Sequence, residues 1–403
     1  MSNIITKEKT ISSCDDFELN IKREQKLTYK YSYPMEKKLK GIVFNIHGFG
    51  AEVAYMDNLR EYIADTFDVL CVDVYYHCFF SRPENGATVE FDNLDLLILQ
   101  DFIDKYNIDF SDVEDINTKS ILYNLDKKIN ILKAKNIFSD EYKIKLPITI
   151  IPKNNEYQNF GMMQAVDYVN VLYDIEKIQL NFTDNYPVSL IGTSHGGYLA
   201  HLIAKIAPHK INNIIDNSSY VKAPLNYFLG KESNITKPEY QLGGYNNIIL
   251  NCFVQTLWTT NKKSNFYFTN GHSQIRNLNN KEHINQESEK SQNKIKFVSY
   301  HSNEDLIANI NDKIMFYKTL QEYGFHATLN IINSPFQVDG KFIKNLSHGM
   351  NMSLKELANK ELPIALKNIN TDNIKNVTIN YTCDNITYIF KHDTNRIEIK
   401  VLK

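Results

Sequence analysis

The chain has 403 residues, of which 43% are hydrophobic and 23% charged. This composition is typical of a folded globular protein and excludes a disordered or fibrous chain. A formal net charge of −2 gives no long-range field that would attract nucleic acid or an anionic membrane surface.

Cysteine usage and the N-terminal sequence predict a cytoplasmic protein. The five cysteines are dispersed, with no C-x-x-C pair and no metal-ligand spacing, which is typical of reduced thiols. Residues 1–20 are polar and lack the apolar core of a signal peptide. No apolar run approaches the roughly 20 residues that a membrane helix needs, so we expect no membrane insertion.

In chain order, residues 16–33 come first, and their alternation of apolar and polar residues predicts an antiparallel edge hairpin. Six short apolar runs without alternation follow and predict strands that are buried on both faces. These runs are residues 41–46, 69–74, 188–192, 211–216, 295–300 and 327–332. Helical patterns lie between them, and one begins after Ser194 and stops at Pro208. The alternation indicates an α/β fold with a mostly parallel sheet covered by helices on both faces.

Three segments fall outside this alternation and define the expected domains. Residues 92–145 are charged and helix-rich, and we interpret them as an insertion. Residues 221–294 are rich in Asn, Lys and aromatic side chains, which is typical of a lid or binding insertion, although aromatics packed on the body would give the same pattern. The tail, 376–402, alternates strongly and predicts a small β meander. The predicted organisation is one domain over 1–370 that carries both insertions, followed by a β appendage over 371–403.

The motif G-T-S-H-G-G follows a predicted strand and opens a predicted helix. Gly192 and Gly196 leave room for a sharp turn that would hold Ser194 in a strained conformation with its hydroxyl exposed. This is the context of a nucleophile elbow. Because strand–glycine–helix turns also occur for structural reasons, the motif needs a base, an acid and oxyanion donors elsewhere in the chain.

An oxyanion loop is predicted at the end of the first buried strand, where His47-Gly48-Phe49-Gly50 stands. The glycines let the backbone turn so that an N–H group points at a reacting carbonyl oxygen. We expect the backbone N–H groups of Phe49 and His195 to form the oxyanion hole. The His47 side chain is interpreted as a structural group of the loop, and the His195 side chain is given no role.

The acid and the base are expected after the serine, in that order. Asp305 lies in a polar turn at the carboxyl end of a predicted strand, where catalytic groups collect in open α/β sheets. The other reading of Asp305 is an acidic residue favoured by a helix dipole, and its rivals as the acid are Glu304 and Asp216. The base candidate is His348, in a loop after the final predicted strand.

These elements resemble the serine hydrolases of the α/β-hydrolase superfamily. The segments SYHSNEDLIA, YKTLQEYGFHATLNII and SHGM are similar to the catalytic end of prolyl-oligopeptidase-like and dienelactone-hydrolase-like enzymes. In those families an H-G-x-x-D turn carries the acid and a G-H-G-like loop carries the base; Ser302 and Ser347 replace two of these glycines here. Residues 157–172 also resemble the helix before the elbow in an uncharacterised group of bacterial hydrolase-like proteins. The resemblance covers roughly residues 20–365.

The resemblance implies an α/β-hydrolase fold and acyl-enzyme chemistry with Ser194, His348 and Asp305 as the catalytic triad. No metal or cofactor is expected, and the sequence contains no H-E-x-x-H, P-loop or Rossmann glycine pattern. The expected partner is a small acyl substrate and not a nucleic acid. We expect an ester of a sugar or glycan precursor, because the aromatic side chains of the insertion can pack against a sugar ring. An acyltransferase and a non-catalytic binding protein on the same scaffold are the alternatives.

Overall fold

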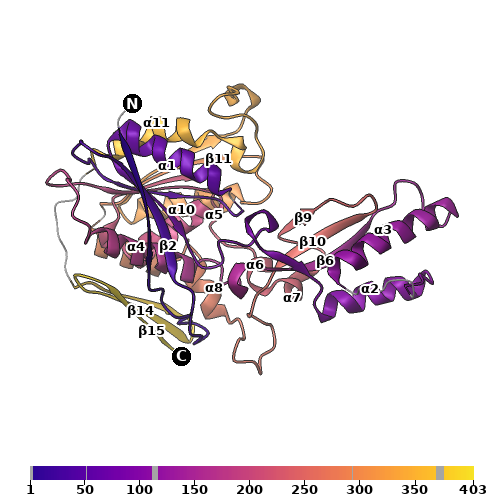
Figure 1. Ribbon diagram of the computed structural model, residues 1–403. Helices are drawn as coiled ribbons and strands as arrows, with labels where there is room; N and C mark the ends of the chain where they lie inside the picture. The colour runs from indigo at the N-terminus through magenta and orange to yellow at the C-terminus, as the bar shows by residue number, and fades with distance from the viewer. Residues whose placement is uncertain (1–2, 51, 111–116, 293, 369–375) are drawn as a thin grey trace. The chain divides into compact units, whose positions relative to one another are not determined.

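The computed structural model describes residues 3–50, 52–110, 117–292, 294–368 and 376–403. These form two compact units, which are coloured along the chain in Figure 1. The main unit comprises Met1–Phe79, Phe160–Ala223 and Phe268–Lys403, and the inserted unit comprises Phe80–Asn159 and Pro224–Tyr267. The boundary predicted between residues 370 and 371 lies outside the described residues.

The main unit is built on an eight-stranded sheet with the order β1-β2-β4-β3-β7-β8-β11-β12. All neighbouring pairs from β4 to β12 are parallel, and β2 pairs antiparallel with both β1 and β4. The bounds are β1 Ile4–Ile11, β2 Leu27–Pro34, β3 Ile42–Ile46, β4 Leu70–Tyr75, β7 Val188–Thr193, β8 Asn213–Asn217, β11 Lys296–Ser302 and β12 His326–Ile332. The six predicted buried strands are therefore present, each within two residues of its expected ends.

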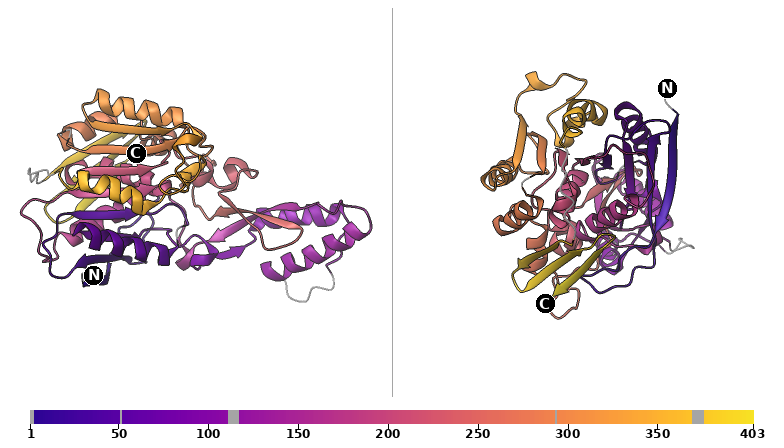
Figure 2. Two further views of the ribbon diagram at one scale, coloured as in Figure 1. Left: turned by 90° about the horizontal axis from the view of Figure 1, so that it is seen from above. Right: turned by 90° about the vertical axis from the view of Figure 1, so that its left-hand side faces the viewer.

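Helices cover both faces of this sheet, so the α/β class predicted from the sequence is confirmed (Figure 2). Two helices, α1 (Val53–Phe67) and α11 (Leu354–Ala365), pack together on one face. The opposite face carries α4 (Met162–Ile175), α5 (His195–Ile206) and α10 (Ile310–Glu322).

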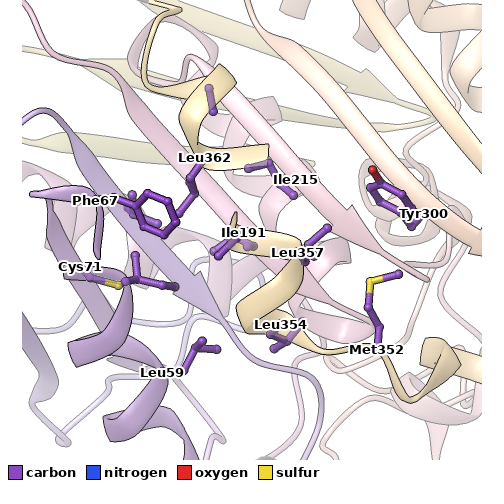
Figure 3. Close-up of a cluster of buried hydrophobic side chains, with 14 of the residues drawn as sticks. Leu59, Phe67, Cys71, Ile191, Ile215, Tyr300, Met352, Leu354, Leu357 and Leu362 are labelled. Carbon is purple, nitrogen blue, oxygen red and sulfur yellow. The ribbon is translucent and has the colours of Figure 1, made fainter. Parts of the chain in front are cut away.

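The core beneath α11 is dry and fully buried. Leu357 and Leu362 of α11 lie against Ile191 and Ile215 of the sheet, and Leu59 joins them from α1 (Figure 3). Each of these side chains is at most 3% exposed, and full burial of one aliphatic side chain contributes roughly 1.5–3 kcal/mol. This packing fixes the helix that directly follows the loop of the candidate base.

The N-terminal edge differs from the prediction. The hairpin is formed by β1 and β2, in the register Ile4↔Pro34 to Ile11↔Leu27, and not within residues 16–33. In the connection between the strands, the Asp16 carboxylate accepts hydrogen bonds from the backbone N–H groups of Glu18 and Leu19. This local turn competes with strand formation, because an Asp side chain offers the backbone an alternative to a ladder.

The inserted unit has its own four-stranded sheet, with the order β5-β6-β10-β9. Its strands are β5 Thr88–Glu90, β6 Ile144–Ile151, β9 Tyr240–Leu242 and β10 Ile248–Val254, and its helices are α2 Asn93–Lys105, α3 Thr118–Ala134, α6 Asn226–Leu229 and α7 Lys231–Asn234. The predicted insertion 92–145 and residues 224–267 of the second one belong to this single unit. In it β6, which lies mostly beyond residue 145, is a parallel neighbour of β10. The end of the second insertion departs from the prediction: α8 (Asn270–Arg276) and α9 (Lys281–Ser291) belong to the main unit.

The C-terminal meander is present as an antiparallel sheet of β13 (Thr378–Cys383), β14 (Ile386–His392) and β15 (Ile397–Leu402). One face of it is buried in the main unit, where the Tyr381 hydroxyl donates to the Lys205 carbonyl over 2.6 Å. His392 Nε2 lies 2.9 Å from the Ile206 carbonyl oxygen. The appendage is therefore docked on α5, the helix that begins after the candidate nucleophile.

Candidate active site

Ser194 occupies a sharp turn between β7 and α5. Its φ and ψ angles are 53° and −118°, a conformation that costs a non-glycine residue on the order of 1–3 kcal/mol and persists only where the surroundings impose it. A Cβ on Gly192 would lie 2.5 Å from the Gly196 backbone, and one on Gly196 would lie 2.0 Å from the Ile46 carbonyl oxygen. Both glycines are thus required by close backbone approach, as the elbow prediction assumes.

His348 connects the serine to an acid. Its Nε2 lies 2.7 Å from Ser194 Oγ, and its Nδ1 lies 2.8 Å from Asp305 Oδ2. Since an ionised carboxylate can only accept, the Nδ1–H donates to Asp305 and Nε2 is left to accept the serine proton. The residues that the sequence assigned to nucleophile, base and acid are therefore in one hydrogen-bonded line.

Asp305 is held rigidly in the turn after β11. Its second oxygen, Oδ1, accepts the backbone N–H groups of Ile307 at 2.8 Å and Ala308 at 2.9 Å. Burial alone would raise the pKa of this carboxyl, but the hydrogen bond from His348 and these amides outweigh burial and lower the pKa. Asp305 is therefore ionised when it faces the imidazole.

The two rivals of Asp305 lie elsewhere. Asp216 is fully buried, and its Oδ2 lies 2.5 Å from Lys313 Nζ and 2.9 Å from Ser299 Oγ. Burial would raise the pKa of Asp216, but Lys313 and His201 lower it well below its usual range. Glu304 is exposed. The side-chain contacts of His348 are with Asp305 and Ser194, so the geometry favours Asp305 as the acid.

The predicted oxyanion loop packs directly against the elbow. A Cβ on Gly48 would lie 3.2 Å from the Thr193 carbonyl oxygen and 3.6 Å from the Ser194 Cβ. The Phe49 ring meets the His195 ring edge-on, with centroids 6.2 Å apart. The role of the Phe49 and His195 N–H groups stays a prediction, because it depends on the position of a substrate oxygen.

The His195 side chain has a structural environment that the sequence did not reveal. Gln164 Oε1 accepts the Gly161 N–H at 3.1 Å while its Nε2 donates to the His77 carbonyl, which orients the amide. That oxygen lies 2.8 Å from His195 Nε2, so Nε2 carries the proton and Nδ1 accepts from the Tyr220 hydroxyl at 2.7 Å. Burial lowers the pKa of His195 to about 3, so the ring is neutral. It anchors the first turn of α5 beneath the nucleophile.

The polar contacts of the His47 side chain are with other side chains at the end of β3 and on β4. The ring is buried, and its Nε2 lies 2.6 Å from the Asn45 amide nitrogen and 3.4 Å from Asp73. Asp73 is in turn paired with the buried Arg60 at 2.6 Å. This network fixes the strand end from which the oxyanion loop departs.

A pocket of about 370 Å³ adjoins the elbow within the main unit. Its walls include Phe49, Tyr55 and Leu354, and Thr193 and Gly48 place it next to the nucleophile. Glu52 supplies the one carboxylate among the described lining residues. Its volume lies within the range of roughly 300–1,000 Å³ that is typical of small-molecule sites.

No group of three or more His, Cys, Asp or Glu side chains is placed to hold a metal ion within the described ranges. No helix in the part of the chain that the structure describes is both long enough and apolar enough to cross a bilayer.

Comparison with known proteins gives a family for nearly the whole chain. The family model described as "Protein of unknown function (DUF2920)" matches residues 7–401. The chain belongs to this family. No curated protein sequence matches it.

The chain is also similar, at low sequence identity, to several solved structures. Acylaminoacyl peptidase from Pyrococcus horikoshii matches with a TM-score of 0.41 and 11% identity over 84% of this chain and 38% of that one, so the chain spans well under half of the peptidase. Est1E from Butyrivibrio proteoclasticus, with bound ferulic acid, matches with a TM-score of 0.42 and 10% identity over 85% and 95% of the chains. A hyperthermophilic esterase from Pyrobaculum calidifontis gives 0.41 and 13% over 90% and 82%. These similarities say nothing about a substrate.

Proposed function

We propose that this protein is a serine hydrolase that cleaves an ester through an acyl-enzyme. The observation that carries the proposal is the unbroken hydrogen-bonded line from Asp305 through His348 to the strained Ser194. A protein that only binds a ligand has no need of a serine in a costly backbone conformation with a base and an acid in line behind it.

In the proposed mechanism, His348 Nε2 takes the proton of the Ser194 hydroxyl as Oγ attacks the ester carbonyl. Asp305 accepts the Nδ1–H of the ring throughout, which keeps the imidazole in the reactive tautomer and stabilises the imidazolium that forms. The imidazolium then protonates the leaving alcohol, and a water molecule activated by the same nitrogen hydrolyses the acyl-enzyme. The N–H groups of Phe49 and His195 are proposed to bind the oxyanion in both steps.

For the acyl side of the substrate we propose a small apolar group, because Phe49, Tyr55 and Leu354 line the pocket beside Ser194. For the alcohol side we propose a sugar hydroxyl. Its support is the aromatic-rich composition of residues 221–294, since aromatic faces pack well on sugar rings.

Covalent labelling by a fluorescent fluorophosphonate tests the proposal. The wild-type chain should be labelled, and Ser194→Ala and His348→Ala should not be. Ser233→Ala and His326→Ala are matched controls, because both residues are exposed and lie outside the triad. The controls should be labelled like the wild type.

The outcome that would overturn the proposal is equally direct. A folded wild-type protein that resists the probe and shows no turnover of short p-nitrophenyl esters above the Ser194→Ala background would exclude an activated serine. Labelling that survives Ser194→Ala would assign the reaction to another nucleophile.

A further inference from the structure

The pocket beside the nucleophile contains one charged group that the proposed mechanism does not use. This group is the carboxylate of Glu52, which is the one Asp, Glu, Lys or Arg side chain among the described residues that line the pocket. Glu52 immediately precedes α1, is exposed, and does not cap the helix with its side chain. Within the described part of the chain, this carboxylate has no hydrogen-bond or ion-pair partner. Its charge is therefore available to a ligand.

The cations of the two helices that border the pocket are engaged elsewhere. Arg60, the one cationic residue of α1, is buried and pairs with Asp73 at 2.6 Å. On α11, the Lys355 ammonium lies 4.8 Å from the centre of the Tyr62 ring, and Lys360 lies over two further aromatic rings. None of these groups lines the pocket, so no described side chain balances its carboxylate.

A partly exposed aromatic ring stands next to this carboxylate. Tyr55 lines the same pocket, and its side chain keeps 46% of its surface exposed. It follows Glu52 by three residues at the start of α1, and residues at this spacing are neighbours on a helix surface. The His47 ring meets the Tyr55 ring edge-on, with centroids 6.2 Å apart. An aromatic face beside a carboxylate attracts an alkylammonium group, because both carry negative potential.

The same end of α1 argues against an anionic ligand. The helix dipole places roughly half of a positive charge at its N-terminus, which by itself would favour an anion. Glu52 carries a full negative charge at that position, so the net charge there is negative. No lysine or arginine is among the described lining residues to oppose it. An acyl group that ends in a carboxylate or phosphate would therefore be repelled.

We propose that this pocket selects a substrate whose acyl group ends in an alkylammonium cation. The apolar part of the acyl group lies against Leu354, and the cation lies between the Glu52 carboxylate and the Tyr55 ring. Turnover of such a substrate rests on the proposed hydrolase function. Binding of the cation requires no reaction at Ser194, so the two proposals can be tested separately.

The kinetic test uses two p-nitrophenyl esters that differ only in charge. One carries γ-(trimethylammonio)butyrate, and the other carries its carbon isostere, in which a tert-butyl group replaces the trimethylammonium. Each kcat/KM is divided by the rate of alkaline hydrolysis of the same ester, which removes the difference in intrinsic reactivity. The wild type should prefer the cationic ester about tenfold, the size expected for one partly exposed ion pair together with one cation–π contact.

Two glutamine variants assign this preference to one carboxylate. Glu52→Gln keeps the shape of the side chain and removes its charge, so the ratio of the two kcat/KM values should fall to about one. Glu61→Gln is the matched control, because Glu61 is an exposed residue of the same helix that lies outside the pocket lining. It should keep the tenfold preference.

The binding test uses the Ser194→Ala variant, which needs no turnover. Choline and its carbon isostere, in which a tert-butyl group again replaces the trimethylammonium, are titrated by isothermal calorimetry. Choline should bind about tenfold more tightly, and adding Glu52→Gln should remove the difference. A preference for choline in a protein that hydrolyses neither ester would refute the hydrolase and support the cation site.

Three results would overturn the proposal. The first is equal or better binding of the neutral isostere by the folded Ser194→Ala protein. The second is a preference for the cation that Glu52→Gln leaves intact. The third is an equal loss of the preference in Glu61→Gln, which would show that the overall charge of the protein, and not this pocket, attracts the cation.

Discussion

Two buried aspartates at the carboxyl ends of neighbouring strands behave in opposite ways. Asp216 ends β8 and is paired with the buried Lys313, whereas Asp305 follows β11 and faces His348. Both carboxylates are fully shielded from solvent, but the His348 side chain keeps 19% of its surface exposed and Lys313 keeps none. The partner of Asp305 is therefore open to solvent, as the proposed chemistry requires, whereas the partner of Asp216 is buried with it, as in a structural ion pair.

The largest effect is expected from a substitution that changes the contact between Asp305 and the His348 imidazole. Asp305→Asn keeps an oxygen for the Ile307 and Ala308 amides but places an NH₂ against His348 Nδ1, which favours the wrong tautomer. We expect ester kcat to fall by about 10⁴-fold, which corresponds to roughly 5.5 kcal/mol, with little change in stability. Steady-state kinetics and urea unfolding of the same samples measure both quantities. A fall in stability large enough to explain the lost activity would contradict the assignment.

The same substitution at Asp216 should instead lower the stability and leave the activity of the folded protein unchanged. Asp216→Asn leaves the Lys313 ammonium buried without a counter-charge, so we expect a loss of about 3–5 kcal/mol in the free energy of unfolding. The molecules that remain folded should hydrolyse ester at the wild-type rate. Urea unfolding followed by circular dichroism measures the loss.

The double variant Asp216→Asn with Lys313→Met is the control for this interpretation. It removes the unpaired charge, and it should recover most of the stability that the single change loses. If the double variant is as unstable as the single one, the cost comes from the hydrogen bonds to Ser219 and Ser299 and not from the ammonium.

A smaller loss of stability is expected from a substitution in α5, the helix that follows Ser194. A Cβ on Gly197 would lie 2.3 Å from Asp216 Oδ1 and 2.9 Å from the Ser219 Cβ. Gly197→Ala should therefore cost about 1–3 kcal/mol by overpacking, although alanine is the better helix former. Gly243→Ala is the matched control, because nothing lies within 4 Å of its added Cβ. If thermal melts showed that Gly197→Ala stabilises the protein, Asp216 and Ser219 would be able to shift and make room for the added methyl group.

The hydrogen-bonded arrangement of Ser194, His348 and Asp305 was predictable from the sequence because its signals are local and ordered. The glycines around Ser194, a polar turn at Asp305 and a loop histidine at His348 each follow a recognisable strand, and parallel strands bring those three ends together. The role of Lys313 was not predictable in this way. It pairs with Asp216 from 97 residues away, and its position on an ordinary helix pattern does not distinguish it from a surface lysine.

The pairing of strands in the inserted unit was also not predictable from the sequence. β6 and β10 pair in parallel although about a hundred residues separate them, so neither segment carries a local sign of its partner. β10 was therefore included in an insertion that looked irregular, and β6 lies mostly beyond the end of the insertion predicted over 92–145. The Gln164–His195–Tyr220 network also joins α4, α5 and the segment after β8, and the motif that contains His195 does not indicate the other two residues.

The smallest expected effect is a difference in the pH dependence of stability. The pKa of Asp305 is lower in the folded protein than the ordinary value of 3.8, so its contribution to stability is fully present above 3.8 and is lost as the pH falls through the lowered value. The difference in the free energy of unfolding between wild type and Asp305→Asn should therefore be constant at neutral pH and shrink in acid. Urea titrations at a series of pH values measure it.

Glu287 is a useful comparison for this test, because its pKa is raised whereas that of Asp305 is lowered. Burial raises its pKa to about 8 despite the opposing Lys205, so the wild type should lose stability relative to Glu287→Gln as the pH rises from 4.5 towards 8. Asp305→Asn should leave that part of the profile unchanged. If both variants instead changed the stability in the same pH range, the two carboxyls would not have separate pKa values. Asp305 could then not be distinguished, as an acid held ionised, from Glu287, as an acid held neutral.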